Sequence, residues 1–327
     1  MAALYEGNEL PGLGGDLDAR AAATVRTLPE GRAPRPAESV EDPAPDVDKH
    51  ADGLGRSVID FPLPPKLTSH GPARIIALCN QKGGVGKTTT SINLAATLAS
   101  YGRKVLAIDF DPQGALSVGL GVIVHDGPTI YDLLLGRERD ATQVIRPTDT
   151  PNLDVIPANI DLSAAEVHLV TEVGREHILA RVLRQVTDRY DVILIDCQPS
   201  LGLLTVNALT AAHGVLIPLE TEYFALRGVA LLIDTIEKVR DRLNPAITLD
   251  GILATMYDPR TLHSREVLER VVDAFGDDVL DTYIRRTVKF PDASVAGQPI
   301  TSFAPEHAAA ESYRRLAREL VARGAVA

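Results

Sequence analysis

The feature that most constrains the fold is a glycine-rich stretch between an apolar run and a helical pattern. Residues Lys82–Thr89 read Lys-Gly-Gly-Val-Gly-Lys-Thr-Thr; they follow the apolar run Arg74–Cys79 and lead into an amphipathic pattern over Thr88–Tyr101. Glycine allows backbone conformations closed to other residues and lets N–H groups approach phosphate oxygens. The following helix adds free N–H groups and the positive end of its dipole. The residues expected to bind a nucleotide are Gly83, Gly84, Val85, Gly86, Lys87, Thr88 and Thr89.

Two side chains of this loop have predicted roles. Lys87 is expected to neutralise the β- and γ-phosphates, and the Thr88 hydroxyl to ligate Mg²⁺. The common phosphate-loop pattern needs a glycine where Gln81 stands, so this is a variant loop with an extra lysine, Lys82. The alternative is a glycine-rich turn without a ligand. Lys-Thr directly after the last glycine favours binding.

Short apolar runs alternate with helical patterns from Ala73 onward, which predicts an α/β fold. Runs that are apolar throughout are buried on both faces, so the sheet should be mostly parallel and doubly wound, with helices on both faces. Strands are expected at Arg74–Cys79, Lys104–Asp109, Asn152–Ile156, Asp191–Asp196, Gly214–Leu219, Leu249–Met256 and Val279–Ile284. Helices are expected at Thr88–Tyr101, Leu226–Leu243, Ser264–Phe275 and Pro305–Arg323.

Acidic residues end two of these strands. Ligands of such sheets bind at the carboxyl ends of the strands, and a carboxylate there can hold a metal directly or through water. Asp196 is the expected Mg²⁺ aspartate, and Asp109 is expected to support the ion through water. Asp111, just beyond its strand, could orient an attacking water. The alternative for Asp109 is a simple strand or helix cap.

Composition excludes several classes of protein. The chain has 327 residues and a net charge of −11, so it is no general polyanion binder and any DNA contact needs a local basic patch. It has two cysteines, Cys79 and Cys197, and no CxxC pair, which argues against a disulfide scaffold or a Cys-rich metal site. No secretory signal and no membrane span are expected, because no apolar run reaches about 18 residues.

The first part of the chain differs from the rest. Residues 1–70 are rich in Pro, Gly and acidic residues and lack helical or strand periodicity. Such a segment buries too little apolar surface to offset the entropy of ordering it. We therefore expect a disordered tail over 1–70, with Val58–Leu63 at the domain edge, and an ATPase domain over 71–327.

Three motifs resemble those of a known family. Lys82–Thr89, Asp109–Gly114 and Asp191–Pro199 resemble the ATPase motifs of the ParA/Soj branch of the MinD/ParA family, and the resemblance runs from about Arg74 to Arg323. It implies a cytoplasmic, nucleoid-associated ATPase that uses ATP and Mg²⁺ and forms a homodimer around its nucleotides. It also implies that Lys82 contacts the partner's phosphates, that Asp111 serves hydrolysis, and that Asp196 is the Walker B residue.

The same resemblance implies binding to DNA without sequence preference and activation by a ParB-type partner, in chromosome or plasmid partitioning. The candidate DNA contacts are Arg260, Arg285, Arg286 and Lys289. Doubled in a dimer, these cations could meet several phosphates. The alternative is ordinary surface charge. Relatives usually carry proline in place of Arg285, which leaves the adenine contacts open.

The same fold is compatible with other functions. A MinD-like membrane-surface protein needs a C-terminal amphipathic anchor, but Ser312–Arg323 lacks Trp and Phe and is better explained as a packed last helix, so no stable membrane association is expected. A relative of the nitrogenase iron protein would hold metal with interface cysteines, whereas Cys79 and Cys197 lie in or just after core strands. An orphan paralogue that positions another protein cargo remains a third alternative.

Overall fold

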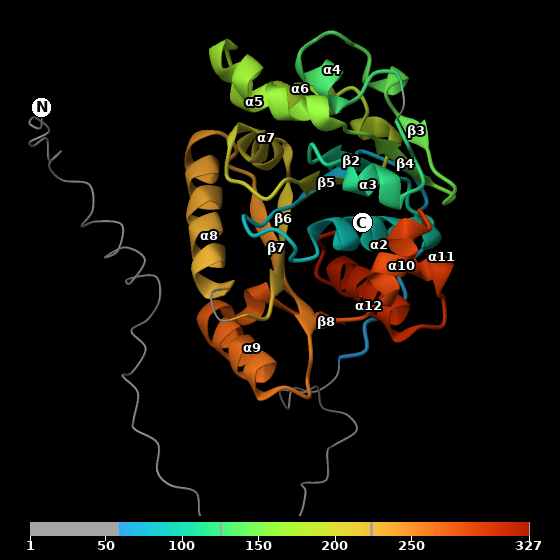
Figure 1. Ribbon diagram of the computed structural model, residues 1–327, viewed down its shortest axis with the longest axis vertical. Helices are drawn as coiled ribbons and strands as arrows, with labels where there is room; N and C mark the ends of the chain where they lie inside the picture. Colours follow the sequence, from blue (N-terminus) through green and yellow to red (C-terminus); the bar gives the residue numbers. More distant parts are fainter. Residues whose placement is uncertain (1–58, 125, 223–224, 327) are drawn as a thin grey trace, which may run out of the picture. The chain divides into compact units, whose positions relative to one another are not determined.

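A mostly parallel sheet forms the centre of the computed structural model, which describes residues 59–124, 126–222 and 225–326. Within these residues, strands follow the order β3-β4-β2-β5-β1-β6-β7-β8 (Figure 1). Only β3 pairs antiparallel; the other neighbours are parallel. The α/β prediction is therefore confirmed. The strands are β1 Arg74–Leu78, β2 Val105–Phe110, β3 Arg146–Pro147, β4 Leu153–Ile156, β5 Val192–Cys197, β6 Gly214–Glu220, β7 Thr248–Tyr257 and β8 Val279–Arg285.

Helices cover both faces of the sheet (Figure 1). Two buried apolar clusters lie between the layers, one on each side of the sheet. One face is covered by α2 Lys87–Ser100, α3 Ala115–Gly119, α10 Lys289–Val295, α11 Ile300–Phe303 and α12 Ala308–Ala322. The other is covered by α4 Ile130–Leu134, α5 Ala165–His168, α6 Ile178–Leu183, α7 Leu203–Ala211, α8 Ala225–Arg242 and α9 Leu262–Phe275.

The alternation of side chains along the central strands decides where the acidic residues point. On β2, Leu106 and Ile108 enter the cluster under α6 and α7, whereas Val105 and Ala107 enter the cluster under α2. Successive strand residues face opposite sides, so Asp109 shares the side of Ala107. The same count on β5 places Asp196 with Leu194. Both carboxylates therefore face the helix that follows the glycine-rich loop.

The structure describes only the last part of the predicted tail, residues 59–70. Residues 1–58, which make up most of the proposed tail, lie outside the described residues, so the division into 1–70 and 71–327 stays a prediction. Of the remainder, Phe61 is buried and its ring lies 5.9 Å from the Arg315 guanidinium on α12. His70 contacts the buried Asp191 carboxylate through Nδ1 at 2.7 Å. Residues 59–70 therefore include two side chains that pack on the domain.

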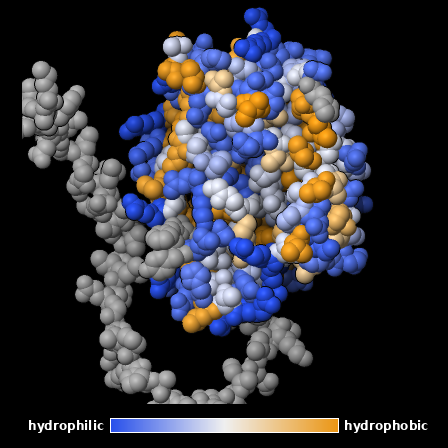
Figure 2. All heavy atoms as spheres, viewed as in Figure 1, coloured by the Kyte–Doolittle hydropathy of each residue, from blue (hydrophilic) through white to orange (hydrophobic). Residues whose placement is uncertain are grey.

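The surface of the described part is polar with small apolar groups. Figure 2 shows apolar side chains scattered in separate groups among polar ones on the face in view. None of the described helices is both long and apolar enough to cross a bilayer. The C-terminal helix α12, considered above as an anchor, instead buries Tyr313, Leu316 and Leu320 against α2 and β8. This packing agrees with its interpretation as the last helix of the domain.

Candidate nucleotide and magnesium site

The glycine-rich loop joins β1 to α2 at the carboxyl edge of the sheet. Gly84 and Gly86 have φ values of 77° and 87°, a region that residues with a Cβ rarely adopt. Helix α2 begins at Lys87, so its free N–H groups open toward the loop. The Lys87 side chain is buried, and its Nζ donates to the Lys82 carbonyl at 3.1 Å. The loop therefore has the strand–turn–helix form that was predicted for phosphate binding.

Two residues that the sequence did not single out hold this loop in place. The Thr255 hydroxyl of β7 donates to the buried Val85 carbonyl at 2.8 Å. Asn80 anchors the other end, because its Nδ2 donates to the Pro218 carbonyl at 2.8 Å while its Oδ1 accepts from the Lys82 amide at 3.0 Å. Sequence spacing gives no signal for Thr255, which lies 170 residues from its acceptor.

Asp109 and Asp196 lie side by side beneath α2. They are direct register partners on the neighbouring parallel strands β2 and β5, and both are almost fully buried. Asp109 Oδ2 accepts from the backbone amide and the hydroxyl of Ser117, at 2.9 and 2.6 Å. Asp196 Oδ1 accepts from the Ser91 hydroxyl at 2.9 Å. The strand ends thus bring together two carboxylates that are 87 residues apart in the chain.

One carboxylate oxygen of this pair is available to bind a ligand. Asp196 Oδ2 is buried and forms no hydrogen bond of normal geometry with the described residues, although the nearby Thr88 hydroxyl acts on this carboxylate. A buried carboxylate oxygen without a partner costs free energy, and oxygen ligands are those that Mg²⁺ prefers. Thr88, the first residue after Lys87, lies on the same first turn of α2. The donor set of Thr88, Asp196 and nearby Asp109 therefore fits a magnesium ion.

Burial raises the pKa values of both carboxyl groups of the pair. Burial, followed by the charge of Asp109, raises the pKa of Asp196 to about 7, while the hydroxyls of Thr88 and Ser91 act in the opposite direction. Burial also raises the pKa of Asp109 to about 6, against its hydrogen bonds from Ser117. Burial lowers the pKa of Lys87, and the charge of Asp196 opposes that shift. A cation placed here would favour the ionised carboxylates.

The third predicted acid has a different setting. Asp111 follows β2 directly and is half-buried, with Oδ1 accepting from the Gln113 amide at 3.0 Å. Its own amide points to Asp109 Oδ1 at 3.4 Å. It therefore lies at the mouth of the site, next to Asp109 and more open to solvent than either member of the acidic pair.

Lys82 pairs with two other acids, Glu220 and Glu222. Its ammonium donates to Glu220 Oε2 at 2.9 Å and also to Glu222. Burial opposes the charged form, but the bonds to Glu222 and Glu220 outweigh it and raise the pKa of Lys82. A hollow of about 390 Å³ adjoins the loop here, lined by residues that include Gln81, Arg227 and Leu231.

The four candidate DNA contacts lie at or just beyond the carboxyl edge of the sheet, and each of them turns to a different neighbour. Arg260 follows β7 and is bound through two nitrogens to Asp258, at 2.9 and 2.8 Å. Arg285 ends β8 beside Tyr283, whereas Arg286 turns to Glu220 at 3.0 Å. Lys289 is at the start of α10, and its Nζ lies 3.7 Å from Asp292 Oδ2. Arg286 is thus joined to the Lys82 network.

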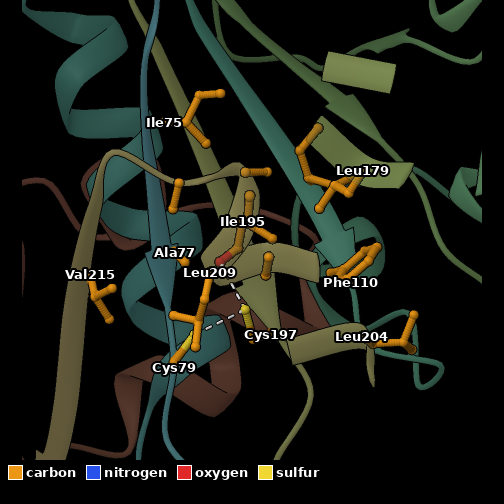
Figure 3. Close-up of a cluster of buried hydrophobic side chains, with 14 of the residues drawn as sticks. Ile75, Ala77, Cys79, Phe110, Leu179, Ile195, Cys197, Leu204, Leu209 and Val215 are labelled. Atoms are coloured by element: carbon orange, nitrogen blue, oxygen red, sulfur yellow. Dashed lines mark hydrogen bonds between the residues drawn. The ribbon is translucent and has the colours of Figure 1, made fainter. Parts of the chain in front are cut away.

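The two cysteines lie on the opposite side of the central strands from the acidic pair. Cys79 follows β1 and Cys197 ends β5; both are buried free thiols with their sulfur atoms 3.2 Å apart (Figure 3). Apolar side chains such as Ile195 and Leu209 surround them in the same view (Figure 3). Among the described residues, no group of three or more His, Cys, Asp and Glu side chains is arranged to hold a metal. This core setting differs from the interface cysteines of an iron-protein relative.

Comparison with known proteins gives consistent matches. A family model described as an AAA domain matches residues 73–249. An uncharacterised Mycobacterium tuberculosis protein is 57% identical over 289 residues, which cover 86% of this chain and 91% of that protein. The chromosome-partitioning ATPase Soj of Treponema pallidum is 52% identical over 250 residues, covering 76% of this chain and 98% of Soj.

Solved structures agree with the fold. A Mycobacterium smegmatis structure described as cobyrinic acid a,c-diamide synthase with bound ADP and magnesium matches with a TM-score of 0.67 and 40% identity, over 77% of this chain and 96% of that one. The cell division ATPase MinD of Pyrococcus furiosus matches with a TM-score of 0.62 and 27% identity, over 76% of this chain and 99% of MinD.

Proposed function

This chain belongs to the ParA/Soj branch of the MinD/ParA family of P-loop ATPases, and on that premise we propose that it binds Mg-ATP at the β1–α2 loop and hydrolyses it. The observation that carries the proposal is the buried pair Asp109 and Asp196 beneath α2, with one carboxylate oxygen unpartnered in the described structure. The M. smegmatis neighbour with bound ADP and magnesium supports the same ligands.

Each residue of the site has a proposed role. The loop amides of residues 83–89 bind the phosphates, and Lys87 neutralises their charge. Thr88 and Asp196 would hold the magnesium ion, with Asp109 behind them, and the ion would supply positive charge against the β- and γ-phosphates. Asp111, half-buried at the mouth of the site, orients the attacking water.

Lys82 acts on a second copy of the chain in this proposal. Two subunits face each other across their nucleotides in a homodimer, and each Lys82 reaches the phosphates of the other. Because Lys82 lies on the exposed side of the loop, with its side chain 46% exposed, its ammonium is placed at the surface rather than over its own acidic pair. Positive charge delivered there stabilises the charge that develops during phosphoryl transfer.

The biological role follows from the partitioning relatives. We propose that the ATP-bound dimer binds DNA without sequence preference, through Arg260, Arg285, Arg286 and Lys289 of both subunits, and so associates with the nucleoid. A ParB-type protein would stimulate hydrolysis and release the dimer. The name of the T. pallidum relative, a chromosome-partitioning ATPase, supports this role. An orphan paralogue with another protein cargo would share the chemistry but not this activator.

Co-sedimentation with DNA tests the role. The chain is mixed with plasmid DNA and with ATP, ADP or no nucleotide, and the expected result is pelleting with ATP alone. A parallel arm replaces DNA by anionic liposomes and separates the MinD-like alternative, since an anchor would give flotation with ATP. The partitioning role would be contradicted if the protein pelleted with DNA equally with ATP, ADP and no nucleotide. It would also be contradicted if the protein floated with liposomes but did not bind DNA.

A measurement of phosphate release separates an ATPase from the synthase activity named for one of its structural relatives. The M. smegmatis neighbour is described as a cobyrinic acid a,c-diamide synthase. Steady release of phosphate from Mg-ATP with no second substrate present is expected for the proposed ATPase. Turnover that requires added cobyrinic acid would favour a synthase instead.

A further inference from the structure

The ion pairs of Lys82 lie within its own subunit. Its ammonium contacts Glu220, at the end of β6, and Glu222, two residues further along the chain. The Glu220 side chain is only 11% exposed, whereas that of Glu222 is 54% exposed. Glu220 is therefore a largely buried partner of the lysine, and Glu222 is a partner at the protein surface.

Glu220 is fixed by a second cation. Its Oε2 accepts from Lys82 at 2.9 Å, while its Oε1 accepts from Arg286 at 3.0 Å. Arg286 comes from the segment that follows β8, so this carboxylate links the phosphate loop to the far strand of the sheet. A carboxylate held from both sides has little freedom to follow Lys82 if the lysine moves away.

We infer that Glu220 and Glu222 form a latch that holds Lys82 on its own subunit, so that pairing of two chains must exchange these ion pairs for the partner's phosphates. The inference rests on the proposed function, because it takes the action of Lys82 on a second subunit as its starting point. The latch makes the two carboxylates positioning residues for Lys82. Neither glutamate belongs to the proposed phosphate or magnesium contacts.

The exchange sets a cost on dimer formation. Lys82 cannot keep both glutamates and also enter the partner's site, so each subunit gives up its latch on pairing. Exposed ion pairs of this kind shift equilibria by about 1.4- to 5-fold each. Because a symmetric dimer opens two latches, removing one carboxylate should tighten ATP-dependent pairing by about 2- to 25-fold.

Chemical labelling of lysines tests the ion pairs without any nucleotide. The full chain is treated with a limiting amine-acylating reagent, and the labelled fraction of Lys82 is read by peptide mass spectrometry against the exposed Lys66. Labelling of Lys82 should rise about 2- to 5-fold in Glu222→Gln and further in Glu220→Gln/Glu222→Gln, since a freed amine deprotonates more easily. Glu269→Gln on α9 is the matched control and should leave it unchanged. Equal labelling in all variants overturns the latch.

Sedimentation velocity with Mg-ATP tests the consequence. The Glu222→Gln variant should form dimers at a lower protein concentration than wild type, Glu222→Asp should behave like wild type, and ATP affinity should not change. Unchanged or weaker pairing of Glu222→Gln, with ATP affinity and thermal unfolding retained, overturns the latch while leaving the proposed function standing. Failure of the wild-type chain to bind Mg-ATP or to pair overturns both.

Discussion

Replacement of Asp196 by Asn should stabilise the folded chain at alkaline pH while abolishing ATP hydrolysis. The physical reason is the burial of this carboxylate, which raises its pKa from 3.8 to about 7. A group whose pKa is higher in the folded state than in the unfolded state contributes stability at low pH and loses it as the pH rises through the folded value. Above pH 7 the charged Asp196 therefore works against folding, and Asn carries no charge.

The size of the effect follows from the same shift. A rise from 3.8 to about 7 corresponds to about 4 kcal/mol of destabilisation at pH 8, of which about 2–3 kcal/mol develops between pH 5 and pH 8. The Ser91 hydroxyl can still donate to the Asn oxygen, but the new amide N–H₂ group needs an acceptor and costs about 1–3 kcal/mol. Near pH 5 the two terms roughly cancel. At pH 8 the variant should be more stable by about 1–3 kcal/mol.

Urea unfolding in EDTA at pH 5 and pH 8 measures this difference without a metal that would offset the charge. Asp234→Asn on α8, an exposed acid in an ion pair with Lys238, is the control and should show little change of relative stability between the two pH values. A stability difference between wild type and Asp196→Asn that is the same at both pH values would refute the reasoning. So would a variant that hydrolyses ATP at the wild-type rate.

Three further variants probe the surroundings of the site. Asp111→Ala should bind ATP normally but hydrolyse it at least about tenfold more slowly, so that dimers persist in sedimentation; wild-type turnover would exclude its role in orienting water. Thr255→Val should lower the free energy of unfolding in urea by about 1–2 kcal/mol and weaken ATP binding, because the Val85 carbonyl loses its hydrogen-bond donor. An unchanged ATP affinity in titration calorimetry would show that the loop does not depend on this hydrogen bond. Arg260→Ala should weaken DNA binding and lower its salt slope by about one per site while sparing ATP turnover; an unaltered slope would remove Arg260 from the interface.

The sheet was predictable because its strands are short and apolar throughout. The expected strand bounds differ from the observed ones by at most one residue at each end, and those of the helices by up to three. The two-residue strand β3 escaped prediction because Arg146–Pro147 is too short to show a pattern. The short helices between residues 115 and 183 escaped for a related reason: turns of four to six residues carry too little periodicity to be distinguished from loops.

Which residues lie together at the candidate site could be predicted where the sequence signal is local, whereas their roles stay predictions. Lys87 and Thr88 follow from one motif, and Asp109 and Asp196 follow from acids at strand ends. The partners of these residues come from elsewhere in the fold. Neither the Thr255 bond to the loop nor the capture of Lys82 by Glu220 has a sequence signal, since the contacts join strands that meet only in the folded sheet.

The partners of the basic residues were also not predictable from the sequence. Sequence proximity grouped Arg285, Arg286 and Lys289 into one cluster, but in the structure they turn to three different neighbours. Arg286 joins the network of Glu220, and Arg260 is bound to Asp258, where it lowers the pKa of that acid to about 2. Whether these cations meet DNA together depends on the geometry of a dimer, so the DNA interface stays a prediction.

Isothermal titration of Mg-ATP into the wild-type chain and into Lys87→Ala is the most direct test of the phosphate-binding loop. The loop amides, the buried lysine and the acidic pair together predict binding of one nucleotide per chain by the wild-type protein. Loss of the Lys87 ammonium should weaken that binding by about 10- to 100-fold, because a charge-assisted hydrogen bond contributes about 1.5–3 kcal/mol. Equal affinities of the two chains, or no heat of binding for the wild type, would contradict the assignment of this site.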